Sequence, residues 1–145
     1  MSFLLDTNVV SEWARARPDP GVVGWLADAD EDRLFLSVIT LAELRRGVER
    51  LPAGRRRTRL DEWLATELPQ RFEGRIVPIT ERVADTWGKL MASREAAGRP
   101  MSAMDGLIAA TAAAHEFALV TRNTADFEGS VTSVVNPWGG SKPGE

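Results

Sequence analysis

Short apolar runs alternate with longer helical patterns along this chain, and this alternation restricts its fold more than any other feature. The runs have the length and the apolar, β-branched composition of strands. They comprise residues 3–5, 34–39, 76–79, 118–121 and 131–135. Because strands that alternate with helices pair in parallel, the order predicts an α/β fold. We expect a central, mostly parallel sheet of four to five strands flanked by helices.

Helical periodicity fills the intervals between these runs. The expected helices cover residues 11–17, 21–28, 40–51, 56–68, 81–97 and 102–115. Pro18 and Pro20 separate the first two helices, and Gly98 ends the fifth. We expect a single domain over residues 1–138, followed by a disordered tail over residues 139–145 that is composed of glycine, proline and polar residues.

The composition excludes several kinds of active site. The chain has no cysteine and one histidine, His115. A thiolate zinc site, a cysteine nucleophile and a histidine-rich metal site are therefore excluded, and a Ser-His-Asp triad would have to use His115. No apolar stretch approaches the length of about 18 residues that a membrane helix needs. No basic segment precedes the first apolar run, so we expect a cytoplasmic protein without a signal peptide.

Acidic residues follow the predicted strands or begin the predicted helices. They are Asp6, Glu43, Asp105 and Asp126. Open parallel sheets bind ligands beyond the carboxyl ends of their strands, so the four acids stand where a site is expected. Carboxylates at one edge repel each other unless a cation neutralises them, and Mg²⁺ and Mn²⁺ prefer oxygen ligands. The pattern predicts hydrolysis of a phosphodiester by a metal-activated water.

Helix capping is a competing explanation for the same acids. Three of them stand three residues after a potential capping residue, in the pairs Thr40–Glu43, Ser102–Asp105 and Asn123–Asp126. Asp6 can itself cap the helix that follows it. For each acid taken singly both explanations stay open, whereas the joint occurrence of all four favours a metal site.

Four segments, in their order along the chain, resemble the PIN-domain ribonucleases. The segments are LLDTNVVSEW (4–13), SVITLAELRRGV (37–48), MSAMDGLIAATAAAHEFALVTRNTADF (101–127) and VVNPW (134–138). The likeness is strongest to the VapC-type toxins of bacterial type II toxin–antitoxin modules, including the FitB-like branch. It implies a PIN-like three-layer fold and a toxin that acts as a Mg²⁺-dependent endoribonuclease, with Mn²⁺ as a possible substitute.

The resemblance also implies roles for individual residues. The acidic positions of the family match Asp6, Glu43, Asp105 and, at its most variable position, Asp126. Its supporting polar positions match Thr7, Asn8, Thr121 and Asn123. We expect Asp6 and Asp105 to bind the metal directly. Glu43 would bind it through water or orient the attacking water, and Asp126 would serve a second metal or the outer shell.

Arginine side chains close to these acids are candidates for contacts with RNA phosphates. Arg45 and Arg46 follow Glu43 on its predicted helix, although pairing with surface acids is the alternative. Arg122 lies closer to the predicted chemistry and is the better candidate. The net charge of −3 argues against a uniformly basic nucleic-acid-coating protein but not against such a local cluster.

The resemblance implies partners that the composition does not show. The expected partner is a small antitoxin with a DNA-binding N-terminus and a C-terminal segment that wraps the toxin. The resemblance further implies an RNA substrate, a homodimer and a larger toxin–antitoxin assembly, with no membrane association.

Two other classes of protein also begin with a strand that ends in aspartate. A haloacid-dehalogenase-like phosphatase needs a second aspartate two residues later, where this chain has Asn8, and a lysine near the site, whereas lysines are few. A receiver-like signalling domain needs a phosphoacceptor aspartate after the third strand, where IVPITER offers only Glu81. The phosphatase is therefore the main alternative to the nuclease.

Overall fold

The computed structural model describes residues 1–140 and has a five-stranded sheet at its centre. The strands are β1 (Phe3–Leu5), β2 (Leu34–Ser37), β3 (Ile76–Val77), β4 (Ala118–Val120) and β5 (Val134–Val135). Their order across the sheet is β3-β2-β1-β4-β5, and all four neighbouring pairs are parallel. The predicted parallel α/β sheet is confirmed, with strands shorter than several of the apolar runs.

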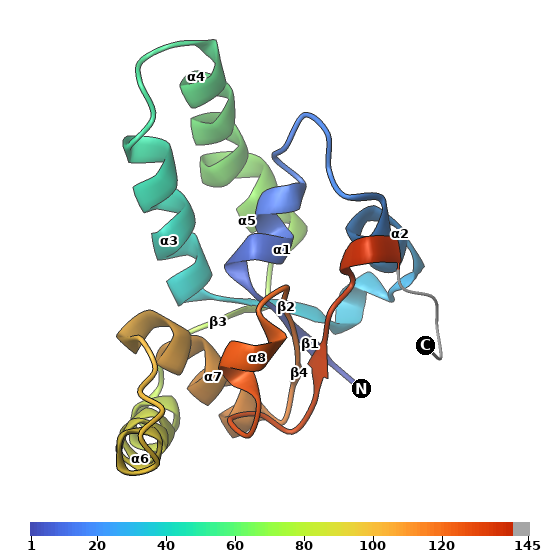
Figure 1. The fold of residues 1–145 in the computed structure, drawn as a ribbon. Coiled ribbons are helices and arrows are strands. Elements are labelled where there is room, and N and C mark those ends of the chain that lie inside the picture. Colours follow the sequence, from blue (N-terminus) through green and yellow to red (C-terminus); the bar gives the residue numbers. More distant parts are fainter. Residues whose placement is uncertain (141–145) are drawn as a thin grey trace.

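Helices connect the strands and cover both faces of the sheet. They are α1 (Thr7–Glu12), α2 (Pro20–Asp28), α3 (Val38–Glu49), α4 (Arg55–Glu62), α5 (Leu68–Arg71), α6 (Glu81–Ala96), α7 (Ala103–His115) and α8 (Thr124–Phe127). Shorter turns lie at η1 (Glu31–Arg33), η2 (Trp63–Glu67) and η3 (Trp138–Gly140). Figure 1 shows α1, α3, α4 and α5 above the sheet and α6 and α7 below it.

The hydrophobic core is divided by the sheet into two parts. Successive residues of a strand point to opposite faces, and β1 follows this rule. Leu5 packs into the core part that includes Val9, Val10 and Phe72, on the side of α1 and α5. Leu4 packs on the other side, against residues of α7 and α8. The result is the three-layer arrangement that the resemblance implied.

The helix expected over 40–51 lies two residues earlier, as α3, because Ser37 caps it. Two other helices differ more from their predicted bounds, for identifiable reasons. The first helix covers Thr7–Glu12 rather than residues 11–17, because Asp6 caps it and Val9 and Val10 bury their side chains on its inner face. The expected helix over 56–68 is realised as α4, a π-helical turn (η2) and α5. Pro69 has no amide hydrogen to donate to the preceding turn, which accounts for the wider π turn at this position.

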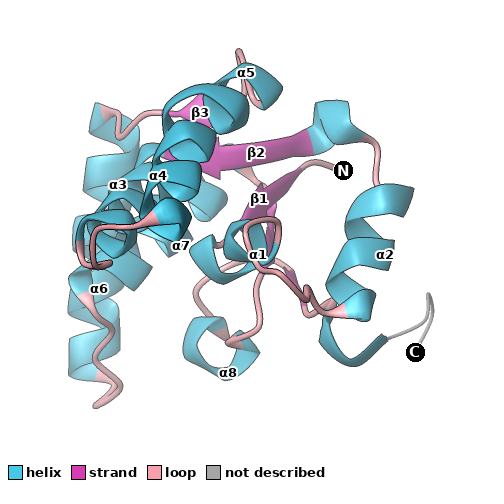
Figure 2. Ribbon diagram, turned by 90° about the horizontal axis from the view of Figure 1, so that it is seen from above, coloured by secondary structure: helices cyan, strands magenta, loops and turns pink. Residues whose placement is uncertain are grey.

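The carboxyl ends of the strands lie near the beginnings of α1 and α3. Figure 2 shows β2 running toward the side on which α3, α6 and α7 lie, with α2 on the opposite side. Asp6 follows β1, and Thr121 follows β4. Ser37 ends β2 and caps α3, because its side chain accepts a hydrogen bond from the amide of Ile39. The ends of β1, β2 and β4 thus bring Asp6, Thr121 and the start of α3 to one edge of the sheet.

The C-terminal part of the described chain packs back onto the fold. Trp138, in η3, packs against the same side of the core as Leu5. Of the predicted tail, residues 139 and 140 belong to η3, and residues 141–145 lie outside the described residues. Within residues 1–140, no helix combines the length and apolar character needed to cross a bilayer.

Candidate active site

Asp6 is the buried acid at the centre of the candidate site. Asp6 is only 5% exposed, although burying a carboxylate away from water costs free energy unless the charge is compensated. Asp6 ends β1, and its Oδ1 accepts a 2.8 Å hydrogen bond from the amide of Thr7, which caps α1. The capping explanation therefore holds for Asp6. It accounts for one carboxylate oxygen and leaves Oδ2 facing the polar residues of the strand edge.

Thr121 reaches Asp6 because the two strands are paired in register. Leu5 pairs with Val120, so the residues that follow them are neighbours across the strand ends. The hydroxyl of Thr121 donates a 2.7 Å hydrogen bond to Asp6 Oδ2. The same hydroxyl accepts hydrogen bonds from the amide of Asn123 at 3.1 Å and from Asn8 Nδ2 at 3.4 Å. One donated and two accepted bonds use the full capacity of a hydroxyl group, so its orientation is well defined.

Asn8 adds a second link between β1 and β4. Its Nδ2 also lies 3.4 Å from Asp6 Oδ2, and its Oδ1 accepts a 3.3 Å bond from the amide of Arg122. The side chain therefore fastens the loop after β4 to the first turn of α1. The predicted supporting residues Asn8, Thr121 and Asn123 all belong to this network, Asn123 through its backbone amide.

Glu43 is held by a residue next to Asp6. Thr7 Oγ1 donates a 2.6 Å hydrogen bond to Glu43 Oε1 and lies 3.2 Å from Thr40 Oγ1. The capping-box explanation for Thr40 and Glu43 is wrong, because α3 begins at Val38 with Ser37 as its cap. Glu43 lies in the second turn of α3, where helix capping gives it no role. The bond from Thr7 instead ties it to the strand edge.

Asp105 lies in the first turn of α7. The side chain of Ser102 accepts a 3.2 Å hydrogen bond from the amide of Asp105, so the predicted cap is confirmed. This bond uses the backbone of Asp105 and leaves its carboxylate available. The side chain is only partly buried. Asp105 thus combines a helix-start position with a carboxylate whose charge acts on Asp6.

The pKa of Asp6 reflects this crowding of acids. The pKa of Asp6 is raised from 3.8 to about 6; burial is the largest cause, and the negative charges of Asp105 and Glu43 also raise it. The hydrogen bonds from Thr121 and Thr7 act in the opposite direction, because they stabilise the ionised form. Three of the four predicted acids therefore interact at one place.

The donor set of this edge suits a hard divalent cation. Within residues 1–140, no three acidic or histidine side chains lie close enough together to enclose an ion directly. Repulsion between carboxylates favours such separation when no cation neutralises them. Mg²⁺ keeps several water ligands and needs only one or two protein carboxylates. Oxygen donors, a buried carboxylate and adjacent like charges therefore fit this ion.

Asp126 is placed apart from the three other acids. It is exposed in α8, and its charge is not among those that shift the pKa of Asp6. Asn123 precedes α8 as predicted, but its side chain makes no capping bond. The carbonyl of Asp126 accepts a 3.2 Å bond from Arg94 of α6. A position in the outer shell agrees better with this placement than direct contact with an ion beside Asp6.

The three candidate arginines have different surroundings. Arg45 is paired with Asp61 at 2.6 Å and Glu49 at 3.4 Å, so the alternative of pairing with surface acids applies to it. Arg122 is exposed, and its guanidinium carbon lies 5.5 Å from the centre of the Trp138 ring. Arg46 is exposed and lines a cavity with Glu43.

Two further residues hold segments of the fold together through backbone groups and were not singled out in the sequence. Arg94 donates hydrogen bonds to the carbonyls of Arg99, Asp126 and Glu128, which hold α8 against α6. Glu12, only 4% exposed, accepts a 2.8 Å bond from the amide of Asp19 and closes the loop after α1. Neither has a sequence signal, because both roles depend on backbone groups of distant or irregular segments.

Comparisons with known proteins identify the family to which this chain is similar. Residues 3–128 match the family model described as PIN domain. The chain is 41% identical over 136 residues to VapC ribonuclease Y4jK of Sinorhizobium fredii, covering 94% of this chain and 97% of that protein. It is also 41% identical over 136 residues to toxin FitB of Neisseria gonorrhoeae, covering 94% and 98%.

A solved structure shows the same fold. The structure of FitAB bound to an IR36 DNA fragment matches with a TM-score of 0.88 and 39% identity, covering 94% of this chain and 95% of that chain. Together with the family match and the two relatives, this similarity confirms the resemblance drawn from the four sequence segments. The chain therefore belongs to the PIN-domain family, among its VapC- and FitB-type members.

Proposed function

We propose that this chain is a Mg²⁺-dependent endoribonuclease and the toxin of a toxin–antitoxin module, with Mn²⁺ as a possible substitute. The observation that carries the proposal is the buried carboxylate of Asp6, whose pKa is raised by burial and by the charges of Asp105 and Glu43. A folded protein keeps such a repulsive arrangement when a cation or substrate uses it. The names of its relatives, a VapC ribonuclease and toxin FitB, support the same function.

Asp6 and Asp105 are the residues that would hold the metal, and Asp126 would act from the outer shell. The ion would lower the pKa of a bound water and stabilise charge on the phosphodiester. Thr121 and Asn8 keep Asp6 Oδ2 in a fixed orientation through their bonds to that oxygen. This support limits the rotation of a carboxylate that an ion would need in one position.

Glu43 would orient the attacking water. Its Oε1 is occupied by the hydroxyl of Thr7, so the carboxylate has one defined rotation. Oε2 is then the oxygen that accepts a hydrogen bond from a water in the site. Thr7 thereby acts on both acids, through its amide on Asp6 and through its hydroxyl on Glu43.

The proposed partners follow from the relatives rather than from any contact in this structure. A structure similar to this chain contains FitAB bound to DNA. We propose that this chain likewise forms a homodimer and a larger complex with a small antitoxin that binds DNA, and that it acts on RNA in the cytoplasm. A phosphatase finds no support, because Asn8 stands where the second aspartate is needed and its amide contacts Asp6.

Cleavage of labelled total RNA by the purified chain tests the proposal. We expect cleavage with Mg²⁺, none with EDTA, and a loss of at least about a hundredfold in Asp105→Asn. Asp85→Asn is the matched control, because Asp85 is an exposed acid of α6 that pairs with Lys89. Cleavage by Asp105→Asn at the rate of the unmodified chain would remove Asp105 from the mechanism. A folded chain that cleaves no RNA would overturn the nuclease assignment.

A further inference from the structure

An open cavity of about 180 Å³ lies beside Glu43. Its lining consists of Ala42, Glu43, Arg46, Gly47, Arg50 and Met104, and we call it the α3 groove. Residues three and four positions apart share one face of a helix, and the lining residues of α3 follow this spacing from Glu43 to Arg50. Met104 comes from α7, directly before Asp105. The groove therefore includes one candidate catalytic acid, Glu43, and the residue that precedes another, Asp105, in α7.

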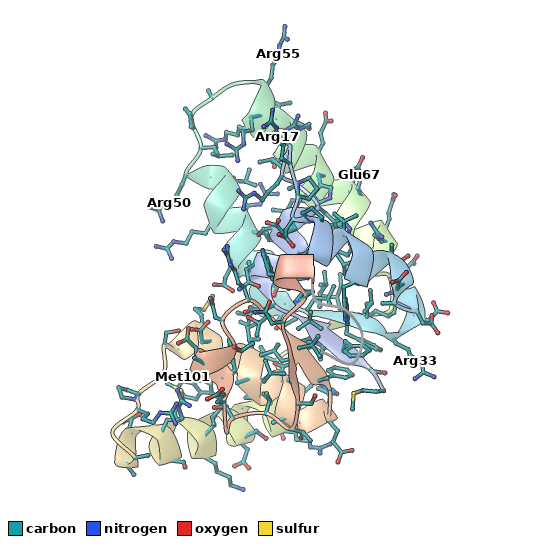
Figure 3. All side chains as sticks on the ribbon, turned by 45° about the vertical axis from the view of Figure 1, so that its right-hand side comes forward. Arg17, Arg33, Arg50, Arg55, Glu67 and Met101 are labelled. Carbon is teal, nitrogen blue, oxygen red and sulfur yellow. The ribbon has the colours of Figure 1, made fainter. Side chains whose placement is uncertain are left out.

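Two arginines of the groove have no counter-ion in the part of the chain that the structure describes. Arg46 and Arg50 are exposed and make neither an ion pair nor a side-chain hydrogen bond within residues 1–140. Figure 3 shows Arg50 pointing outward from the end of α3. Arg45, on the same helix, is instead bound to Asp61 and Glu49. The groove thus presents two available guanidinium groups, one helical turn apart, to an anion.

Met104 gives the groove an apolar side. It is 37% exposed, one of the few large hydrophobic residues with this exposure in the described chain. Gly47 contributes no side chain to the floor, and a methyl group built there would meet no atom within 4 Å. A ligand that fits this surface combines a flat apolar part with negative charge. A nucleotide has both, since its base has an apolar face and its phosphate is an anion.

We propose that the α3 groove binds the RNA nucleotide next to the scissile phosphodiester. Arg46 and Arg50 bind its phosphates, and Met104 packs against its base. The inference rests on the proposed ribonuclease function and adds a substrate subsite to it. An RNA strand that enters the groove continues directly to Glu43 and Asp105, which favours RNA over an acidic peptide as the occupant.

Filling the groove is the first test. Gly47→Leu is compatible with the backbone, because a Cβ built at Gly47 meets no atom within 4 Å and leucine favours a helix more than glycine does. Gly88→Leu is the matched control, because Gly88 lies in the middle of α6 and has equally open surroundings. We expect Gly47→Leu to reduce RNA cleavage about tenfold or more, and Gly88→Leu to cleave as the unmodified chain does.

Removing single charges is the second test. Binding of a labelled single-stranded RNA of mixed sequence is measured in the Asp105→Asn chain, so that no cleavage occurs. We expect Arg46→Ala and Arg50→Ala each to weaken binding about tenfold and to lower the salt dependence by roughly 0.7 per lost phosphate contact. Arg45→Ala, which removes the same charge from the same helix, should change binding less than about twofold.

The outcomes separate this inference from the function on which it rests. If the unmodified chain cleaves RNA and the groove variants bind and cleave equally well, the groove proposal fails and the nuclease proposal stands. Equal losses for all three arginine variants would show a general charge effect and also overturn it. If the groove variants bind RNA as tightly as the unmodified chain but bind an acidic antitoxin peptide less tightly, the groove belongs to the antitoxin and the groove proposal fails. If the unmodified chain neither binds nor cleaves RNA, both proposals fail.

Discussion

Thr121 donates a 2.7 Å hydrogen bond from its hydroxyl to Oδ2 of Asp6, across 115 positions of sequence. The bond exists because β1 and β4 are parallel neighbours whose register places the two residues side by side just beyond the strand ends. A residue at the end of the fourth strand thereby orients an acid at the end of the first and lowers its pKa, against the larger effect of burial.

Replacing Thr121 by valine should weaken metal binding. The change keeps the shape of the side chain but removes the hydroxyl that lowers the pKa of Asp6, so this pKa rises further. Since a metal ion competes with the proton for the carboxylate, Mg²⁺ affinity should fall more at pH 6 than at pH 8. Titration calorimetry at both pH values measures this difference. Thr111→Val, which removes a buried hydroxyl far from the site in α7, is the control, and equal affinities would contradict the expectation.

The stability of the metal-free chain should depend on the ionisation of Asp6. Its pKa is raised, mainly by burial, from 3.8 to about 6 in the folded protein. A raised folded-state pKa contributes stability that is fully present below pH 3.8 and is lost as the pH rises through 6. The ionisation of Asp6 should lower the free energy of unfolding by roughly 2.4 kcal/mol between pH 4 and pH 7.

Urea denaturation in EDTA, with and without Asp6→Asn, isolates this contribution. The asparagine variant lacks the titrating group, so the difference in unfolding free energy between the two chains should change with pH in the direction given. Above pH 6 the variant should be the more stable chain, because it buries no charge. Parallel pH profiles for the two proteins would show that Asp6 is not perturbed.

Gly106 should tolerate no side chain, because α6 packs closely against α7 at this residue. A Cβ built on Gly106 would lie 2.6 Å from Met91 Sδ and 2.9 Å from Trp87 Nε1. Gly106→Ala should therefore lower the free energy of unfolding by about 1–3 kcal/mol. Trp87 Nε1 also donates a 3.2 Å bond to the carbonyl of Ala103, so the turn that carries Asp105 should shift.

Chemical denaturation and RNA cleavage together measure the two effects at Gly106. Gly88→Ala is the matched control, since its surroundings are open and alanine favours a helix by up to about 1 kcal/mol. The Gly88→Ala chain should have the same free energy of unfolding as the unmodified chain, or a higher one. A Gly106→Ala chain as stable as the control would show that Met91 and Trp87 move aside at little cost.

Arg94 should keep α8 in place. Its guanidinium donates hydrogen bonds to the carbonyls of Arg99, Glu128 and Asp126, over distances of 2.8 to 3.3 Å. Arg94→Ala should leave these groups without a partner and cost about 1–3 kcal/mol. Hydrogen exchange should accelerate in residues 124–130 more than elsewhere. Lys89→Ala, which breaks an exposed pair of the same helix, should cost less than about 0.5 kcal/mol and leave that exchange unchanged.

The sequence predicted the bounds of helices and strands well where those bounds depend on residues close together in the chain. The strand at 3–5 was expected with the bounds that the structure shows, and the helix over 81–97 with the correct first residue, because hydrophobic period and capping residues determine them. The first helix was expected four residues too late, since the buried faces of Val9 and Val10 become visible only against the sheet. The π turn before Pro69 was missed for a similar reason, because a helical period continues through it.

The sequence by itself determined the elements, their parallel arrangement and the identity of the acids, because those depend on residue type and on spacing along the chain. Only the tertiary structure decided which polar groups meet. The register of β1 and β4 brings Thr121 to Asp6, and the packing of α1 against α3 brings Thr7 to Glu43. The tertiary structure also placed Asp126 apart from the other acids. It showed that Arg45 is paired with surface acids and that Arg46, within residues 1–140, is not. Contacts between distant segments depend on how the layers pack, and no local pattern encodes them.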